Sequence, residues 1–156
     1  MNLTKRGYGV LAIVVVAELL AFTYGARALN AIAAPAVVAL LAGLVMVRRT
    51  ETPTAERESV PPGFPGDTRT MTVDVDGAGV ASIAESVPEG LTVAEPRVER
   101  TLPATITYSL ACDRRGRHTV GPLTVGVRDV LGLFERTHEV GSTARVLVYP
   151  PVYKLA

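Results

Sequence analysis

The sequence predicts a two-helix transmembrane hairpin followed by an all-β, immunoglobulin-like antiparallel sandwich domain. Two long apolar stretches near the N-terminus predict the helices, and alternating apolar and polar residues after position 67 predict the strands. Charge separates the two halves, because residues 1–49 carry five basic and one acidic side chains whereas residues 50–156 carry 11 basic and 14 acidic ones. We therefore expect a hairpin at 1–49, a Pro-rich linker at 50–67 and a β-sandwich domain at 68–156.

Each apolar stretch is long enough to cross a membrane. The first covers residues 8–24 and the second residues 29–47, and between positions 8 and 47 the only charged residues are Glu18 and Arg27. A hydrocarbon core about 30 Å thick needs roughly 20 helical residues. Since the connector GARA is too short to be a domain, the two spans are expected to form an antiparallel hairpin.

The basic residues around the spans predict their orientation. Four lie at the outer ends of the spans and one lies in the connector: Lys5, Arg6, Arg48 and Arg49 outside, and Arg27 between. Because Lys and Arg are enriched on the cytoplasmic side, we expect a two-pass protein of the cell membrane with both termini and the β domain in the cytoplasm. A cleaved signal peptide is the alternative, since a basic start, an apolar run and Ala-Arg-Ala at 26–28 resemble a cleavage pattern.

Glu18 is the one carboxylate inside a predicted span. An ionised side chain at this depth is costly, so Glu18 is a candidate for proton or ion handling. The alternative is a packing role, in which Glu18 faces the other helix or reaches toward the membrane interface near Arg27.

The β domain is predicted from short segments with a period of two. One inner face holds Met71, Val73 and Val75, and another holds Ile106, Tyr108, Leu110 and Cys112. Further strands are expected near residues 80–83, 91–93, 118–127 and 143–150, with a bulge at Gly121 and Pro122. Several short strands at this spacing favour an antiparallel sandwich.

Composition and motifs exclude several functions. The soluble part has no concentrated basic face of the kind that tracks phosphates, so nucleic acid is not expected as a partner. The single cysteine, Cys112, is in phase with core residues and is interpreted as a buried hydrophobe. His118, in phase with Val120, is interpreted as a strand residue. Because no motif selects a catalytic, metal-binding or cofactor-binding set, the protein is predicted not to be an enzyme and to need no cofactor.

Two short segments are candidate contact sites. Arg114, Arg115 and Arg117 form the densest basic cluster of the soluble part, which is a candidate contact for anionic lipid or a partner, or simply a charged hairpin tip. In the segment VRDVLGLFER, residues 127–136, Asp129 is expected to cap backbone donors and Gly132 to let the chain bend. Leu131, Leu133 and Phe134 would then plug one end of the sandwich, or else form a docking knob.

The order of motifs in residues 114–150 resembles the membrane proteins of the domain-of-unknown-function 58 family. There a transmembrane hairpin precedes a β domain with an RRGR-aromatic, GP, DPLGLF and VYP pattern, and a von Willebrand factor A-like domain follows. Here the chain reads RRGRH, GP, DVLGLF and VYP, so His118 replaces an aromatic residue and Val130 replaces proline. The sequence reaches only PPVYKLA after this pattern, so we expect the hairpin and β domain of a truncated or split member, with no metal site carried over.

The resemblance implies a function that residue patterns alone do not supply. It implies a non-enzymatic scaffold or interaction module that acts with a MoxR-type AAA+ ATPase and a von Willebrand A-like partner in the assembly or maturation of protein complexes. The alternative is an envelope-facing structural or ligand-binding β domain with no link to an ATPase. A third class, a membrane-bound hydrolase, would need a catalytic constellation that the sequence lacks.

Overall fold

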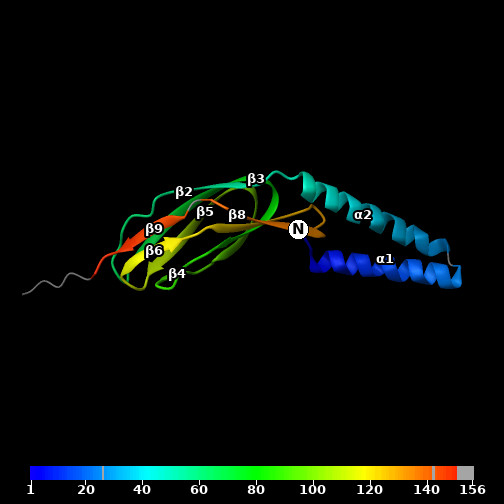
Figure 1. Cartoon of the computed structure of the whole chain (residues 1–156), viewed down its shortest axis with the longest axis horizontal. Coiled ribbons are helices and arrows are strands. Elements are labelled where there is room, and N and C mark those ends of the chain that lie inside the picture. Colours follow the sequence, from blue (N-terminus) through cyan, green and yellow to red (C-terminus); the bar gives the residue numbers. More distant parts are fainter. Residues whose placement is uncertain (26, 142, 151–156) are drawn as a thin grey trace, which may run out of the picture. The chain divides into compact units, whose positions relative to one another are not determined.

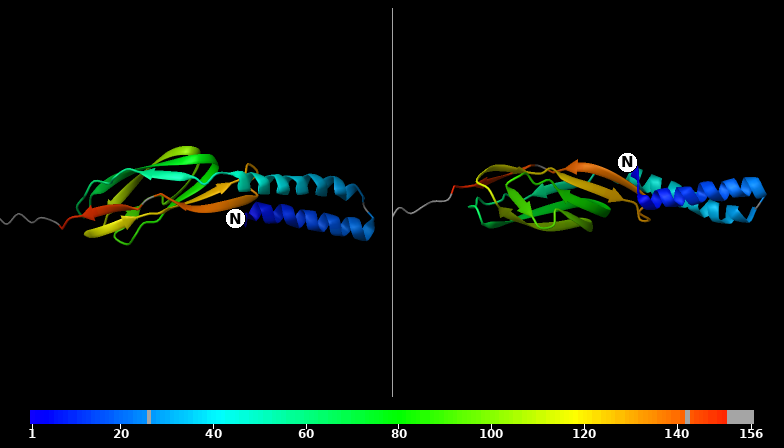
Figure 2. Two further views of the ribbon diagram at one scale, coloured as in Figure 1. Left: turned by 45° about the horizontal axis from the view of Figure 1, so that its top comes forward. Right: turned by 90° about the horizontal axis from the view of Figure 1, so that it is seen from below.

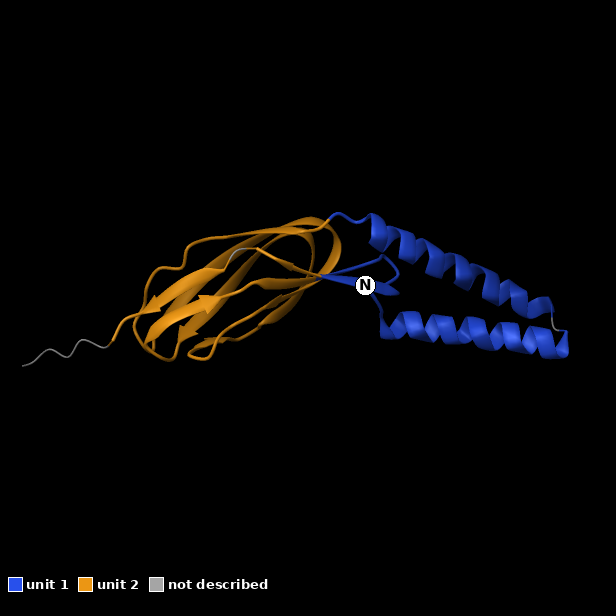
Figure 3. Ribbon diagram, in the orientation of Figure 1, with its two compact units in different colours: residues 1–51, 126–137 blue, residues 52–125, 138–156 orange. Residues whose placement is uncertain are grey.

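The computed structural model describes residues 1–25, 27–141 and 143–150. Two apolar helices are followed by an antiparallel all-β domain with an immunoglobulin-like sandwich fold, which confirms the predicted fold class (Figure 1). The chain forms two compact units, coloured separately in Figure 3: a hairpin unit of residues 1–51 and 126–137, and a β unit of residues 52–125 and 138–156.

Two helices of 20 residues each dominate the hairpin unit. Helix α1 is Lys5–Tyr24 and helix α2 is Asn30–Arg49, with a short 3₁₀ turn, η1, at Arg27–Leu29 between them. They run side by side in both views of Figure 2. Both helical regions, Lys5–Tyr24 and Arg27–Arg49, are long and apolar enough to be candidate membrane spans.

Most apolar side chains of the two helices point outward. Small or β-branched residues make up the buried contacts: Gly7, Val14 and Ala17 in α1, and Ala33, Gly43 and Val47 in α2. By contrast Phe22 is 94% exposed and Leu19 is 65% exposed. Apolar surface of this extent is unfavourable in water, so the exposed faces favour a membrane anchor.

Short β elements complete the hairpin unit. Strand β1, Asn2–Leu3, pairs antiparallel with the start of β8, Phe134–Val140, with Leu3 opposite Phe134. The turn at residues 129–133 leads from β7, Leu123–Arg128, into β8. Both β7 and β8 continue from this unit into the β unit.

The β unit contains two antiparallel sheets. In the larger one, β3 (Thr68–Glu85) pairs with β5 (Arg97–Cys112), β5 pairs with β4 (Leu91–Val93), and β3 also pairs with β7 and with β2 (Thr54–Arg57). In the smaller one β6 (Gly116–Val120) pairs with β9 (Ala144–Val148).

The inner faces of the β unit are those predicted from alternation. On β3, Met71, Val73 and Val75 are at most 1% exposed, and on the inner face of β5 the alternate residues from Ile106 to Cys112 are at most 5% exposed. The smaller sheet contributes buried valines from β6 and β9. Large fully buried aliphatic side chains of the β unit include Met71, Val73, Val75, Ile83, Leu110, Val120, Leu123, Val125, Val146 and Val148.

The structure differs from the predicted strand plan at four places. Residues 118–127, expected to be one strand with a bulge at Gly121 and Pro122, belong to two strands, β6 and β7, in different sheets, and β8 was not predicted as a strand. Residues 54–57, expected to be linker, form β2 and pair with residues 73–76 of β3. Residues 80–83, expected to be a separate strand, continue β3 after a shift of register between Val75 and Gly79. Gly79 has a φ of +95°, and a bulge with glycine lets a strand bend without ending its pairing.

The two units also divide the chain differently from the predicted hairpin, linker and β domain. The hairpin unit takes residues 126–137 from the region expected to be sandwich, and the β unit takes residues 52–67 from the expected linker. Local sequence patterns cannot show this division, because residues 1–51 and 126–137 are far apart in the chain. Three backbone segments therefore connect the units, rather than one linker.

Candidate functional site

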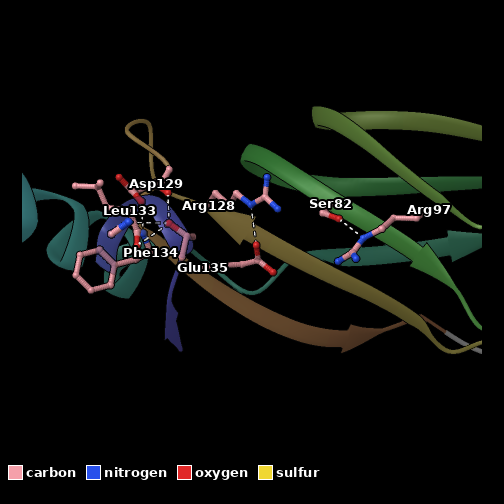
Figure 4. A network of polar contacts seen from close by, with 10 residues as sticks. Ser82, Arg97, Arg128, Asp129, Leu133, Phe134 and Glu135 are labelled. Atoms are coloured by element: carbon pink, nitrogen blue, oxygen red, sulfur yellow. Dashed lines mark hydrogen bonds and ion pairs between the residues drawn. The ribbon is translucent and has the colours of Figure 1, made fainter. Parts of the chain in front are cut away.

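The candidate site is the turn at residues 129–134 together with the start of α1 and the last turns of α2, all within the hairpin unit. We call it the clasp. It includes most of the apolar segment VRDVLGLFER, residues 127–136. Figure 4 shows the polar contacts of Asp129, Leu133 and Phe134 in this part of the hairpin unit.

Asp129 organises the turn through its carboxylate. Its Oδ1 accepts a hydrogen bond from the Phe134 amide at 2.7 Å, and its Oδ2 accepts one from the Leu131 amide at 3.0 Å. The Asp129 carbonyl accepts from the Gly132 amide at 2.9 Å, and Gly132 has a φ of +67°. Because Asp129 is only 5% exposed, these bonds replace the water that a buried carboxylate would lose. The predicted roles of Asp129 and Gly132 are confirmed.

Thr4 connects the turn to helix α1. It is the N-cap of α1, and its hydroxyl oxygen accepts a hydrogen bond from the Gly7 amide at 3.2 Å. The same hydroxyl lies within donating distance of the carbonyl oxygens of Gly132 and Leu133. The Thr4 amide donates to the Leu133 carbonyl at 2.9 Å. One residue thus satisfies a free donor at the helix start and two carbonyls of the turn.

Two helical glycines allow the turn to approach closely. A Cβ atom on Gly7 would lie 2.3 Å from the Leu133 carbonyl oxygen, and one on Gly43 would lie 3.0 Å from Asp129 Oδ2 and 3.2 Å from Phe134 Cδ2. Backbone atoms cannot yield to a contact of 2.3 Å without a shift of the chain. Helix α1 therefore needs glycine at position 7, whereas a Cβ at Gly43 would require the side chains of Asp129 and Phe134 to move by a few tenths of an ångström.

The centre of the clasp is an apolar cluster of Val47, Leu133 and Phe134, which are 1%, 5% and 7% exposed. Around them pack five partly buried apolar residues: Leu3, Val10, Ala39, Leu40 and Leu44. Leu133 and Phe134 are thus core residues of the hairpin unit, whereas the sequence analysis expected them at the end of the sandwich. Leu131 lies outside the cluster and is 52% exposed. The neighbouring Val130 is 81% exposed.

An ion pair borders the clasp on the β7–β8 ribbon. Arg128 Nε donates to Glu135 Oε2 at 2.7 Å, and both side chains are partly exposed (Figure 4). An ion pair with this solvent access contributes at most about 1 kcal/mol to stability. It helps to align β7 and β8, and it contributes less to stability than the buried hydrogen bonds of Asp129.

Two residues of the Arg cluster, Arg114 and Arg115, lie in the turn between β5 and β6, and the third, Arg117, is the second residue of β6. Arg114, Arg115 and Arg117 are all exposed. Two hydrogen bonds fix the backbone of this turn. The amides of Asp113 and Arg114 both donate to the carbonyl oxygen of Gly90, at 3.0 and 3.1 Å. The cluster is therefore presented by a fixed backbone within the β unit.

Three other candidates from the sequence have clear positions. Glu18 is on an exposed face of α1, so it does not serve as a helix-packing residue in this hairpin. His118 is partly buried on β6, and its Nε2 lies 2.8 Å from the Arg114 carbonyl oxygen. Cys112 is 1% exposed, and burial raises the pKa of its thiol, as expected for a core residue.

The β unit contains a buried ion pair that was not predicted from the sequence. Arg57 Nη1 on β2 lies 3.1 Å from Glu85 Oε1 at the end of β3, and the side chains are 1% and 0% exposed. Within the described residues, Arg57 Nε and Nη2, Glu85 Oε2 and the Tyr108 hydroxyl have no hydrogen-bond partner. A signal existed for Glu85, which follows Ala81 and Ile83 in the inward phase of β3.

Burial controls the ionisation of this cluster. Desolvation raises the pKa of Glu85 despite the opposing effect of Arg57, and burial together with the nearby Glu85 raises the pKa of Tyr108 to about 12. Among the described residues, no group of three His, Cys, Asp or Glu side chains is arranged to hold a metal ion. The chemistry available to the pair is electrostatic: two buried charges that depend on each other.

The structure combines two candidate membrane helices with an immunoglobulin-like β-sandwich. No protein-family model and no curated protein sequence matches it. Among solved structures, the PKD domain of an M14-like peptidase from Thermoplasmatales archaeon SCGC AB-540-F20 is similar with a TM-score of 0.44 and 16% identity, over 66% of this chain and 99% of that one.

Two further solved structures show comparable similarity. WR4, an MSP family member of C. elegans, has a TM-score of 0.41 and 5% identity, over 59% of this chain and 100% of that one. The E. coli chaperone DraB has a TM-score of 0.43 and 11% identity, over 63% of this chain and 55% of that one. Identities and scores this low carry no argument about function.

Proposed function

We propose that the chain is a non-enzymatic, membrane-anchored β-sandwich module that binds other proteins at the cytoplasmic side of the membrane. The observation that carries the proposal is the clasp, in which Thr4 and Val47 of the apolar hairpin bind and pack against the turn between β7 and β8. A hairpin that served only as a leader would need no such contacts with a segment more than 80 residues away in the sequence.

The proposed partners are a MoxR-type AAA+ ATPase and a von Willebrand A-like protein, with assembly or maturation of protein complexes as the process. Support comes from the order RRGR, GP, LGLF and VYP in residues 114–150. The exposed Arg114, Arg115 and Arg117 offer an acidic partner surface a concentrated positive charge. The cytoplasmic side is supported by the four basic residues at the outer helix ends and is where ATP is available.

Cysteine labelling in intact cells tests the orientation. Arg27→Cys, in the connector, should react with a membrane-impermeant maleimide added outside the cell. Glu139→Cys, an exposed position of β8, should react only after the membrane is permeabilised. The unaltered chain is the control, because its Cys112 is buried. Labelling of Glu139→Cys in intact cells would contradict the cytoplasmic placement and favour an envelope-facing structural domain.

Co-purification from native membranes tests the partner. The full chain should retain an AAA+ ATPase in a nucleotide-dependent manner, comparing ATP, ADP and a non-hydrolysable analogue. The triple variant Arg114→Ser, Arg115→Ser, Arg117→Ser should lose it, whereas Arg100→Ser with Arg145→Ser, at exposed positions on other strands, should keep it. If no AAA+ ATPase is retained under any nucleotide condition, the ATPase link is wrong and a structural anchor remains.

A further inference from the structure

An apolar groove opens on the hairpin unit beside the clasp. It has a volume of about 510 Å³ and is lined by residues of α1, by Ala39 of α2 and by Leu131 and Leu133 of the turn. Its size lies within the range of small-molecule sites, about 300–1,000 Å³. The groove is open at Gly9 on α1, because a Cβ there would meet nothing within 4 Å.

The groove is almost entirely apolar and accessible. Ile13 on α1 is 55% exposed and Leu131 on the turn is 52% exposed. Side chains of this size in an open groove need an apolar occupant. Since α1 and α2 are candidate membrane spans, the hydrocarbon of a lipid is the apolar material next to this surface.

Arg6 supplies the one charge in the lining of the groove. A Cβ on Gly132 would lie 3.9 Å from Arg6 Nη1, so the guanidinium extends over the turn. In the described part of the chain, no ion pair engages Arg6, which is exposed. Lys5 is next to it at the same end of the hairpin as Arg48 and Arg49, the last residues of α2. A guanidinium over an apolar groove is complementary to a phosphate that carries an acyl chain.

We propose that this groove binds one anionic phospholipid, with its phosphate on Arg6 and an acyl chain along Gly9, Ile13 and Ala39. The inference rests on the proposed membrane anchorage of the hairpin. The lipid adds apolar contact to the outer side of Leu133, whose inner side belongs to the clasp. Anionic lipid therefore becomes part of the surface that stabilises the turn.

Native mass spectrometry of the full chain in mild detergent tests the site with two probes, dioleoylphosphatidylglycerol and dioleoylphosphatidylcholine. We expect the anionic lipid to bind about fivefold more tightly, which corresponds to one basic residue at an anionic lipid surface. Arg6→Gln should abolish this preference, whereas Arg27→Gln at the opposite end of the hairpin should retain it. Inorganic phosphate at millimolar concentration should not displace the lipid, since it lacks the acyl chain.

A second pair of variants tests the groove itself. Gly9→Leu fills open space and should reduce binding of both lipids at least about fivefold, whereas Ala12→Leu, on an exposed position outside the groove, should not. Equal binding of the two lipids, or unchanged binding in Arg6→Gln or Gly9→Leu, would overturn the site and indicate non-selective annular lipid. Displacement by inorganic phosphate would instead assign an anion site without lipid.

Alkaline carbonate extraction of membranes separates this inference from the proposed function. If the full chain stays in the membrane pellet and shows no lipid preference, the groove proposal fails while the anchor stands. If the chain is released to the supernatant, membrane anchorage itself fails, and the lipid site fails with it.

Discussion

Thr4 donates its backbone amide to the carbonyl oxygen of Leu133 at 2.9 Å, across a separation of 129 residues, and its hydroxyl to the neighbouring Gly132 carbonyl oxygen at 2.5 Å. The same hydroxyl oxygen accepts the Gly7 amide at the start of α1. Helix initiation and the position of the turn therefore depend on one side chain. This relationship gives the first prediction.

Thr4→Val should lower the free energy of unfolding of the hairpin unit by about 1–3 kcal/mol, because it removes a helix cap and the hydroxyl donor of the Gly132 carbonyl while preserving side-chain shape. Thr4→Ser retains the hydroxyl and is the matched control. Unfolding of the full chain in mixed detergent micelles gives the free energy, and hydrogen exchange at the Gly7 amide gives the local effect. Equal stability of the two variants would show that the hydroxyl bonds contribute nothing.

A pair of glycines two positions apart on α1 gives the second prediction. Gly7→Ala should destabilise the hairpin unit by about 1–3 kcal/mol, because its Cβ would meet the Leu133 carbonyl oxygen at 2.3 Å. Gly9→Ala meets nothing and should stabilise it by about 0.5–1 kcal/mol through helix propensity. Thermal unfolding of both variants in the same detergent compares them. Opposite signs are expected, and a loss of stability in both would contradict the close approach at Gly7.

The buried pair in the β unit gives the third prediction. Arg57→Met or Glu85→Leu alone should cost about 3–5 kcal/mol, because each leaves one buried charge without its partner. The double variant should recover most of this loss, since an apolar pair of similar size needs no compensating charge. Hydrogen exchange of β3 amides in the full chain measures the difference. Additive losses in the double variant would mean that the two charges are independent.

The raised pKa of Glu85 gives the fourth prediction, for pH dependence. Because the pKa in the folded chain lies above its ordinary value of 4.5, the folded state holds this proton more tightly than the unfolded state does. The stability from Glu85 is therefore full below pH 4.5 and is lost as the pH rises through the raised pKa. Glu85→Gln has no such proton, so its stability should fall less over this interval. Unfolding midpoints of both proteins from pH 4 to 8 test the sign, and a steeper decline in Glu85→Gln would refute it.

The exposed carboxylate on α1 gives the fifth prediction. Glu18 faces outward from the hairpin. If the hairpin spans a membrane as proposed, Glu18 faces lipid and makes the insertion of α1 less favourable. Glu18→Leu should make the apparent insertion free energy of α1 about 3 kcal/mol more favourable, measured by glycosylation mapping of the full chain. Val15→Leu, also on an exposed position, is the neutral control. No gain in Glu18→Leu would indicate that Glu18 is shielded from lipid by a partner.

Alternation along the chain predicted the inner faces of β3 and β5, because these faces are buried over several consecutive alternate residues. Helix length and charge placement likewise predicted α1 and α2. Asp129 and Gly132 were predicted in their turn roles, because those roles depend on bonds within five residues. These features depend on residues close together in the sequence, so sequence patterns can predict them.

The rest of the site depends on contacts between residues far apart in the sequence, which no local pattern predicts. Nothing near Leu133 indicates that its carbonyl oxygen is bound by Thr4, and nothing near Gly43 indicates that Phe134 lies against it. Arg57 was missed because β2 has four residues among prolines and mixed charges, too few for a period to appear. The role of its partner Glu85 was not predicted, because no residue close to Glu85 in the sequence indicates that an arginine 28 positions away lies against it.

The division of the hairpin unit into residues 1–51 and 126–137 sets an order of events during synthesis. The helices leave the ribosome first, and Leu133 and Phe134 follow only after β2 through β7 have been translated. Until then Val47 and its apolar neighbours lack the side chains that cover them. The hairpin unit is therefore completed only after translation of most of the β strands, so a ribosome that stalls before residue 133 leaves the two helices without Leu133 and Phe134.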